Sequence, residues 1–424
     1  RVDVYAPAMG HGEAVEKVTR QRAEAMASRL IEAGHWRKGM SPGYPLGLNI
    51  VDNTSMSTSW EDMAIVLAGP RSGKSLCYAI PAVLSAPGPC LATSNKGDIL
   101  DVTAPIRRLD HPNGEIWTFD PERIADPNRK SAPWVWDLIA SVQSIADAKR
   151  IADCWRYASG QPQTGGDDFF PGTAAQQLAD YLFAAHLGGK TVADVFRWAS
   201  SERNTEPVTI LTKHEGYGEI AARVSSVIAL TPETRSGVFG SLQTMVAFLA
   251  DPDVIEWVLP REGDGTPEGR DVFDPLAFAT SEGDTLYLLS AQGRPSTALT
   301  ASLTAVVAFT AFQYAQSECT DNNRRLPRPM CCVLDEAANI CRWPELADVY
   351  SYFGSAGIPI MTIWQNPDQG KAAFGETNFG SLFNNANITV YLGGIKDAKF
   401  LGEISQLVGQ REIVRGSVNI DGNG

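Results

Sequence analysis

Residues 63–75 read MAIVLAGPRSGKS. Residues 63–68 form a short apolar run of the kind that becomes a buried strand, and a helical pattern, KSLCYAIPAVL, follows over 74–84. The turn between them matches the phosphate-loop pattern G-x4-G-K-[ST] at every position but the first, where Ala68 replaces glycine. A strand, a glycine-containing turn and a helix in this order predict a nucleotide-binding loop.

The predicted loop offers the groups that bind a nucleoside triphosphate. Gly73 lets the backbone approach the phosphates, while successive N–H groups and the helix N-terminus hold the anion. Lys74 would reach the β- and γ-phosphates, and the Ser75 hydroxyl would hold Mg²⁺. The expected cofactors are therefore ATP and Mg²⁺. The predicted cofactor-binding residues are Gly69, Pro70, Arg71, Ser72, Gly73, Lys74 and Ser75.

A second apolar run, MCCVLDE over 330–336, ends in two carboxylates. Paired with a phosphate loop this is the Walker B pattern, because the metal needs a carboxylate across from the loop serine. We predict Asp335 and Ser75 as the Mg²⁺ ligands, and Glu336 as the catalytic base that activates the attacking water. The Asp-Glu pair favours hydrolysis over passive nucleotide binding.

Gln365 follows the apolar run 358–364 and is the second predicted catalytic residue. An amide at the end of a neighbouring strand can sense the γ-phosphate or orient water, although a hydrogen-bonded strand end would also explain it. Lys96 and Asp98, in TSNKGD, are expected at the carboxyl edge of the sheet, where ligands bind in such folds. A loop followed by a helix cap explains these two residues equally well.

Multimeric ATPases usually supply an arginine to the γ-phosphate of a neighbouring subunit. Arg235, Arg270 and Arg294 are candidates, and the sequence does not favour one of them.

Short apolar runs bounded by turn residues alternate with helical patterns, which predicts an α/β fold with a parallel, doubly wound sheet. Besides 63–68, these runs cover 89–94, 115–120, 284–290, 330–335, 358–364 and 387–393. From about 136 to 250 the strand signal fades and one-face helical periodicity takes over, as in 141–155 and 171–186. We therefore predict a segment 1–60 that leads into a discontinuous nucleotide-binding domain, 61–138 and 251–424, with an all-α domain, 139–250, inserted.

Composition limits the possible partners and surroundings. The 424 residues carry a formal net charge of -13, so any nucleic-acid contact must be local, weak or made in a pore where cations of several subunits converge. The seven cysteines lack metal-binding spacing and indicate a reducing compartment. The apolar stretch 298–315 is expected to be a buried helix. Because the chain begins at Arg1, we expect membrane helices to lie outside it.

Together these motifs resemble the type IV secretion coupling proteins, the TraG/TraD-like conjugative ATPases related to the FtsK and HerA motors. The resemblance covers roughly residues 40–410. The stretches that carry it are SWEDMAIVLAGPRSGKS (59–75), TSNKGDIL (93–100), FDPERI (119–124), TPETRSGVFGSLQ (231–243), GDTLYLL (283–289), VLDEAANI (333–340), YFGSAGIPIMTIWQNPDQG (352–370) and FNNANITVYLGG (383–394).

The resemblance implies a RecA-like domain with an inserted all-α domain, an N-terminal membrane anchor and a hexameric ring around a substrate pore. It places the chain on the cytoplasmic side of a membrane. The implied partners are channel components together with single-stranded DNA, relaxase-bound DNA or protein substrates. This soluble chain alone is expected to be monomeric if the ring depends on its anchor. Two departures are Ala68 in the loop and Ala356, where many relatives carry arginine.

Three functions fit these features to different degrees. The first is an ATP-driven motor that moves DNA or protein into a secretion channel. The second is a docking receptor gated by nucleotide with little hydrolysis, which Ala356 and the acidic charge favour and Glu336 opposes. The third, a chromosome-partitioning DNA pump, conflicts with the inserted helical block and with the lack of a recognisable basic winged-helix module.

Overall fold

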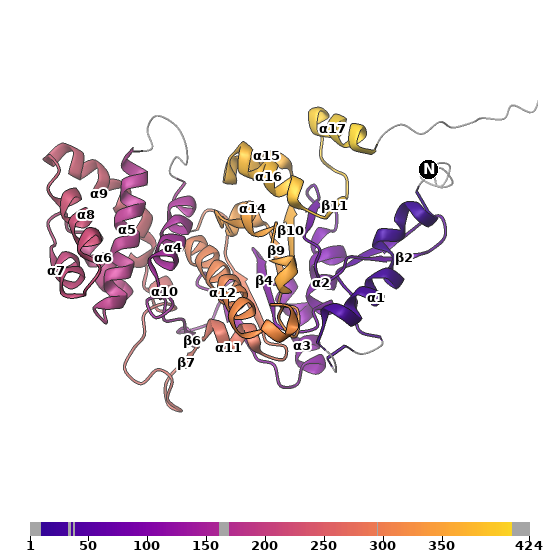
Figure 1. The fold of residues 1–424 in the computed structure, drawn as a ribbon, viewed down its shortest axis with the longest axis horizontal. Helices are drawn as coiled ribbons and strands as arrows, with labels where there is room; N and C mark the ends of the chain where they lie inside the picture. Colours follow the sequence, from indigo (N-terminus) through magenta and orange to yellow (C-terminus); the bar gives the residue numbers. More distant parts are fainter. Residues whose placement is uncertain (1–9, 33–34, 37–38, 161–168, 295, 409–424) are drawn as a thin grey trace, which may run out of the picture.

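The computed structural model describes residues 10–32, 35–36, 39–160, 169–294 and 296–408. A seven-stranded parallel sheet lies at its centre, in the order β11-β3-β10-β9-β4-β8-β5 (Figure 1). Each predicted apolar run contains one of these strands. The strands are β3 (Ala64–Leu67), β4 (Cys90–Ser94), β5 (Ile116–Phe119), β8 (Thr285–Leu289), β9 (Cys331–Asp335), β10 (Ile360–Trp364) and β11 (Ile388–Tyr391).

Both faces of the sheet are covered, which is why its inner strands are almost uniformly apolar. In β3, Ala64 and Val66 belong to one buried cluster and Ile65 and Leu67 to another, as the two-residue period of a strand requires. The first face is covered by a π-helical turn (Ser75–Ala79), α2 (Ile80–Ser85) and α3 (Asp98–Asp110). The second is covered by α12 (Thr297–Glu318), α13 (Ala337–Ile340) and α14 (Leu346–Val349).

Between β5 and β8 lies a helical block that forms a separate lobe (Figure 1). A two-stranded parallel pair, β6 (Trp134–Val135) and β7 (Asp271–Val272), joins the two ends of this insertion. The domain limits at 139 and 250 stay predictions. The block consists of α4 (Ile145–Ala158), α5 (Phe169–Leu187), α6 (Val192–Ala199), α7 (Glu206–Lys213), α8 (Gly218–Ile228), α9 (Pro232–Val246), the 3-10 turn η5 (Ala247–Ala250) and α10 (Pro252–Ile255).

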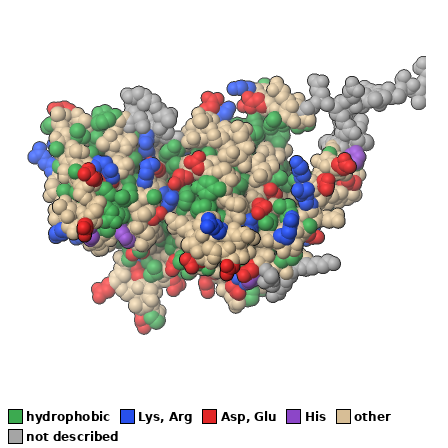
Figure 2. Space-filling model, in the orientation of Figure 1, with side chains coloured by type: hydrophobic (Ala, Val, Ile, Leu, Met, Phe, Trp, Pro, Cys, Tyr) green, Lys and Arg blue, Asp and Glu red, His purple; other side chains and the backbone are tan. Residues whose placement is uncertain are grey.

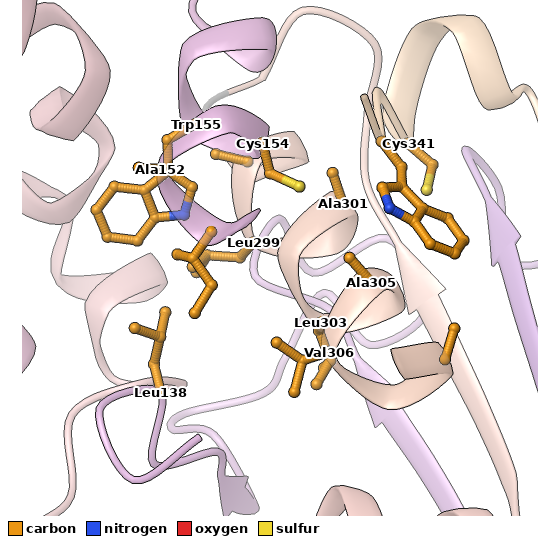
Figure 3. Close-up of a cluster of buried hydrophobic side chains, with 14 of the residues drawn as sticks. Leu138, Ala152, Cys154, Trp155, Leu299, Ala301, Leu303, Ala305, Val306 and Cys341 are labelled. Atoms are coloured by element: carbon orange, nitrogen blue, oxygen red, sulfur yellow. The ribbon is translucent and has the colours of Figure 1, made fainter. Parts of the chain in front are cut away.

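Helix α4 connects the block to the sheet domain by packing on α12. Figure 3 shows Trp155 and Ala152 of α4 beside Leu299 of α12 in this buried cluster. The Trp155 indole donates a hydrogen bond to Ser302 Oγ at 3.0 Å, and Arg150 pairs with Glu345 at 3.0 Å. Among the described residues, α12 is the one helix long and apolar enough to cross a membrane, but 72% of its most apolar window is buried inside the protein. The expectation of a buried helix here is confirmed.

The N-terminal segment packs against the first face of the sheet. It contains a 3-10 turn (Gly12–Val18), α1 (Arg20–Leu30) and the hairpin β1 (Pro45–Leu48) and β2 (Ser55–Ser57). The buried Tyr44 hydroxyl donates to the Pro359 carbonyl at 2.9 Å, which ties the hairpin to the start of β10.

Short helices complete the sheet domain, before β8 and β9 as well as around β10 and β11. These are α11 (Pro275–Thr280), the 3-10 turns η6 (Thr320–Asn322) and η7 (Gly354–Ala356), α15 (Pro367–Phe374), α16 (Glu376–Asn385) and α17 (Ala398–Val408).

Candidate nucleotide-binding site

The phosphate loop and the acidic end of β9 meet at the carboxyl edge of the sheet. Strand β10 lies between β3 and β9, so both motifs leave the sheet on the same edge one strand apart. Lys74 Nζ lies 2.6 Å from Asp335 Oδ1 and 2.6 Å from Glu336 Oε1. Ser75 Oγ donates to Asp335 Oδ2 at 3.2 Å, so the two predicted metal ligands present their oxygens together.

The phosphate loop has the backbone shape that its sequence predicts. Gly73 has a φ of 82° and Arg71 a φ of 60°, both left-handed, and the Gly69 N–H donates to the Gly393 carbonyl beyond β11 at 3.1 Å. A Cβ on Gly69 would lie 2.7 Å from the Gly394 carbonyl oxygen, so this loop glycine is required by close backbone packing.

An unpaired hydroxyl supports the fit of a phosphate group. Ser72 Oγ is buried and has no hydrogen-bond partner among the described residues. A buried hydroxyl without a partner is unfavourable, and a phosphate oxygen in the loop would satisfy it. With Lys74 beside it, and with the Ser75 and Asp335 oxygens beyond, these residues fit a triphosphate and its magnesium ion.

The charges at the site are strongly coupled. Burial raises the pKa of Asp335 above its ordinary value, although Lys74 opposes the effect. Burial also acts against ionisation of Glu336, but hydrogen bonds from Lys74 and Gln365 outweigh it and hold the pKa of Glu336 below its ordinary value. Burial would lower the pKa of Lys74, but Asp335 and Glu336 together keep that pKa raised. Lys74 is therefore a stable cation that balances two carboxylates.

Glu336 is held by three side chains. Besides Lys74, the Gln365 amide donates to Glu336 Oε1 at 2.8 Å and to Oε2 at 3.0 Å, and the Asn339 amide donates to Oε2 at 2.7 Å. The Glu336 backbone is left-handed, with a φ of 55°, a conformation that is costly for a residue other than glycine. Backbone strain and a fully occupied carboxylate together indicate a functional position.

Three residues of this arrangement are absent from the sequence prediction. Asn339 orients Glu336, Thr93 Oγ1 donates to the Asp335 carbonyl at 2.8 Å, and Gly394 packs on the phosphate loop. Asn339 has a local signal, because it stands three residues after Glu336 in VLDEAANI. Gly394 has no such signal, since only the fold brings β11 beside β3.

Two family models match this chain. The model for type IV secretory system conjugative DNA transfer matches residues 24–260, more than half of the chain. The chain belongs to this family. A second model, the TraM recognition site of TraD and TraG, matches residues 329–424. No curated protein matches this member of the family.

Solved structures of the conjugative coupling protein TrwB, one of them of the form TrwBdeltaN70, share the fold of this family member. The trigonal form with sulphate is 15% identical with a TM-score of 0.58, and covers 92% of this chain and 81% of its own. The complex of TrwB with the ATP analogue ADPNP is 15% identical with a TM-score of 0.54, and the match covers 94% of this chain and 85% of the TrwB chain. The predicted α/β fold, a RecA-like nucleotide-binding domain with an inserted helical domain, is confirmed.

The three arginines of this chain that could act on a neighbouring subunit differ in their surroundings. Arg235 is buried in the helical block, where it pairs with Glu202 at 3.1 Å, and Arg270 pairs with Asp264 at 2.6 Å. Both are engaged within their own chain, whereas Arg294 is exposed in the loop after β8.

The remaining predicted positions contribute little to the site. Ala356 is fully buried, so its side chain has no access to a neighbouring subunit. Lys96 and Asp98 are exposed; α3 begins at Asp98, and its N-cap residue, Gly97, has no side-chain capping hydrogen bond.

Proposed function

We propose that this chain is the ATPase portion of a coupling protein that drives substrates into a type IV secretion or conjugation channel. The observation that carries the proposal is the cluster of Lys74, Ser75, Asp335, Glu336 and Gln365 at one edge of the sheet. It combines a phosphate-binding cation, a pair of metal ligands and an oriented carboxylate. These are the parts that ATP hydrolysis requires.

In the proposed reaction Lys74 leaves the two carboxylates and binds the β- and γ-phosphates of ATP. Ser75 and Asp335 would hold Mg²⁺, which would supply positive charge beside the phosphate oxygens. The Ser72 hydroxyl, which has no hydrogen-bond partner among the described residues, would donate to a phosphate oxygen. Loss of the Lys74 ion pair frees a lone pair on Glu336 Oε1, which keeps its hydrogen bond from Gln365 and can also face a water molecule.

Glu336 then acts as the base. With Lys74 on the phosphates, the Gln365 and Asn339 amides still stabilise the carboxylate form of Glu336, which takes a proton as the water oxygen bonds to the γ-phosphorus. The bond from that phosphorus to the β–γ bridging oxygen breaks, which leaves ADP and inorganic phosphate. Gln365 is hydrogen-bonded to Glu336 and directly follows β10. When the γ-phosphate is lost, a movement of Gln365 would therefore be passed on to β10 and to the residues that follow it.

We further propose that the chain works on the cytoplasmic side of a membrane as a hexamer when anchored. The substrates would be single-stranded DNA, relaxase-bound DNA or proteins, and the channel proteins would be partners. In Figure 2, cationic and anionic side chains are interspersed over the face in view, as expected for a protein whose nucleic-acid contacts are local.

One observation favours the alternative, a nucleotide-gated docking receptor. All the contacts of Glu336 with Lys74, Gln365 and Asn339 restrain it, and its exposed fraction is only 5%. If nucleotide binding does not release Glu336, ATP would assemble and gate the complex with little hydrolysis.

A substrate-transfer assay with the complete, membrane-anchored protein separates the two functions. Glu336→Gln keeps the shape of the side chain but removes the base, and ATP binding should persist. For a motor, we expect transfer to fall to the level of Lys74→Ala. Normal transfer by Glu336→Gln, with loss only in Lys74→Ala, would reject the motor in favour of the receptor.

A further inference from the structure

A cavity of about 360 Å³ lies where the helical block meets the sheet domain. Its wall combines Trp155 of α4, Met245 and Phe248 at the end of α9 and in η5, and Arg294 in the loop after β8. Asn339 of α13 and Arg342 complete it. The cavity thus joins three parts of the chain that are far apart in sequence, and one of its residues contacts Glu336 directly.

Within the part of the chain that the structure describes, the two arginines of this cavity are cations without an acidic partner. Neither Arg294 nor Arg342 forms an ion pair with a carboxylate of the described residues, in a chain whose net charge is -13. Arg342 is half-buried; its Nε donates to the Ala338 carbonyl at 3.1 Å and its Nη1 to the Tyr157 carbonyl at 3.4 Å. Burial lowers the pKa of Arg342. A guanidinium desolvated in this way favours an anionic ligand.

The rest of the wall is apolar or carries amides. The rings of Trp155 and Phe248 form an edge-to-face pair with centroids 4.8 Å apart, and Met245 lies beside them. Gln292 and Asn339 contribute side-chain amides. Trp155, Met245 and Phe248 are almost fully buried, so they form the floor of the cavity. A phosphate on the arginines with a planar base over this apolar floor matches this combination better than a carboxylate side chain, which offers no planar apolar part.

The cavity is connected to the catalytic carboxylate by α13. Asn339 both lines the cavity and donates to Glu336 Oε2 at 2.7 Å. Arg342, which follows α13, donates a hydrogen bond to the carbonyl of Ala338 within that helix. A ligand that moves Arg342 or Asn339 therefore changes the hydrogen bonds that restrain Glu336.

We propose that this cavity binds one nucleotide of a single-stranded nucleic acid and that its occupancy, relayed by Asn339, repositions Glu336. The relay rests on the proposed function, whereas the binding site does not. Asn339 is a positioning residue in this scheme, because it acts on the reaction through Glu336. The site also provides a local nucleic-acid contact on an otherwise acidic protein.

The binding test uses a short fluorescein-labelled oligo(dT) and fluorescence anisotropy over a range of salt concentrations. We expect Arg342→Gln and Arg294→Ala each to weaken binding about tenfold and to flatten its salt dependence. Arg203→Ala, which removes an exposed arginine outside the cavity, should bind like the parent chain. Arg294 is exposed, so its removal tests the site even if Arg342→Gln does not fold.

Three results would overturn the binding site: no binding by the parent chain, equal binding by all variants, or Arg342-dependent binding of a poly-glutamate peptide in place of oligo(dT). The last result would assign the cavity to an acidic protein segment.

The relay is tested by the ratio of hydrolysis rates with and without oligo(dT). Asn339→Ala should bring this ratio close to one while anisotropy still detects the oligonucleotide. A ratio equal to that of the parent chain would reject the relay. A chain that binds oligo(dT) through Arg342 but never hydrolyses ATP would instead contradict the proposed motor and leave the binding site standing.

Discussion

The Gln365 amide donates hydrogen bonds to both carboxylate oxygens of Glu336, at 2.8 and 3.0 Å. The two residues follow β10 and β9, which are adjacent in the sheet, so the contact is set by strand order. A carboxylate held at both oxygens has a fixed orientation. The amide also stabilises its ionised form, which contributes to the lowered pKa of Glu336.

Replacing Gln365 by Ala should therefore slow the chemical step more than it weakens binding. We expect kcat to fall about 10- to 100-fold, because Glu336 loses its orientation, with less than about a threefold change in the Kd for ATP. Steady-state hydrolysis and titration with a fluorescent ATP analogue measure the two quantities. Gln406→Ala, at an exposed position of α17, is the matched control. An unchanged kcat would show that Gln365 only terminates its strand.

Lys74→Ala should destabilise the protein as well as abolish ATP binding. Side chains of Asp335 and Glu336 are only 3% and 5% exposed, and without Lys74 they would repel each other. Loss of one partner from a buried ion pair costs about 3–5 kcal/mol. Thermal melts in chelator and in excess Mg²⁺ measure this, and Mg²⁺ should recover part of the loss. Lys399→Ala, at an exposed site, is the control; equal melting temperatures for both variants would contradict the account.

A methyl group at Gly69 tests the packing that shapes the phosphate loop. Its Cβ would lie 2.7 Å from the Gly394 carbonyl oxygen and 2.8 Å from that carbonyl carbon, so the backbone must move. We expect Gly69→Ala to lower stability by about 1–3 kcal/mol and to weaken ATP binding. Gly380→Ala adds the same methyl group inside α16 with nothing within 4 Å, and should be neutral or slightly stabilising. Similar ATP affinities in the two variants would refute the packing argument.

Because His111 is partly buried, we expect the folded protein to lose stability in mild acid. Burial lowers its pKa to about 4 from an ordinary 6.5; the Arg107 guanidinium, 2.7 Å away, contributes, and Asp110 opposes. The folded protein thus binds this proton less tightly than the unfolded chain does. The contribution of the neutral His111 side chain to the free energy of unfolding is complete above about pH 6.5 and is lost as the pH falls towards 4.

Chemical denaturation between about pH 7 and pH 5 checks this prediction. His111→Gln should show a smaller drop in the free energy of unfolding over that interval than the parent chain. Equal drops would mean that His111 remains accessible to protons in the folded protein.

Much of the sheet could be predicted because its strands are parallel and buried on both faces. Such strands are continuous apolar runs, as in β9 and β10, and their ends fall within two residues of the predicted limits. The short pair β6 and β7 has only two residues in each strand and leaves no periodicity to detect. The phosphate loop and Asp335 carry enough local chemistry to predict that they meet.

Contacts that depend on backbone shape could not be predicted in the same way. Asn339 is close to Glu336 in the sequence, but the backbone at Glu336 is left-handed, with a φ of 55°, and nothing in the Glu336 side chain indicates that conformation. Ala356 shows a second limit, which concerns an expectation taken from the family resemblance. The resemblance singles out this position because many relatives carry arginine there, but Ala356 is buried before β10, and the local sequence does not indicate that burial.

ATP hydrolysis by this chain, measured as a function of protein concentration with and without single-stranded DNA, tests the central claim most directly. The account predicts a rate per chain that rises with concentration, increases with DNA and disappears in Lys74→Ala and Glu336→Gln. A chain that binds ATP in a Lys74-dependent manner, yet shows no hydrolysis at any concentration, would contradict it.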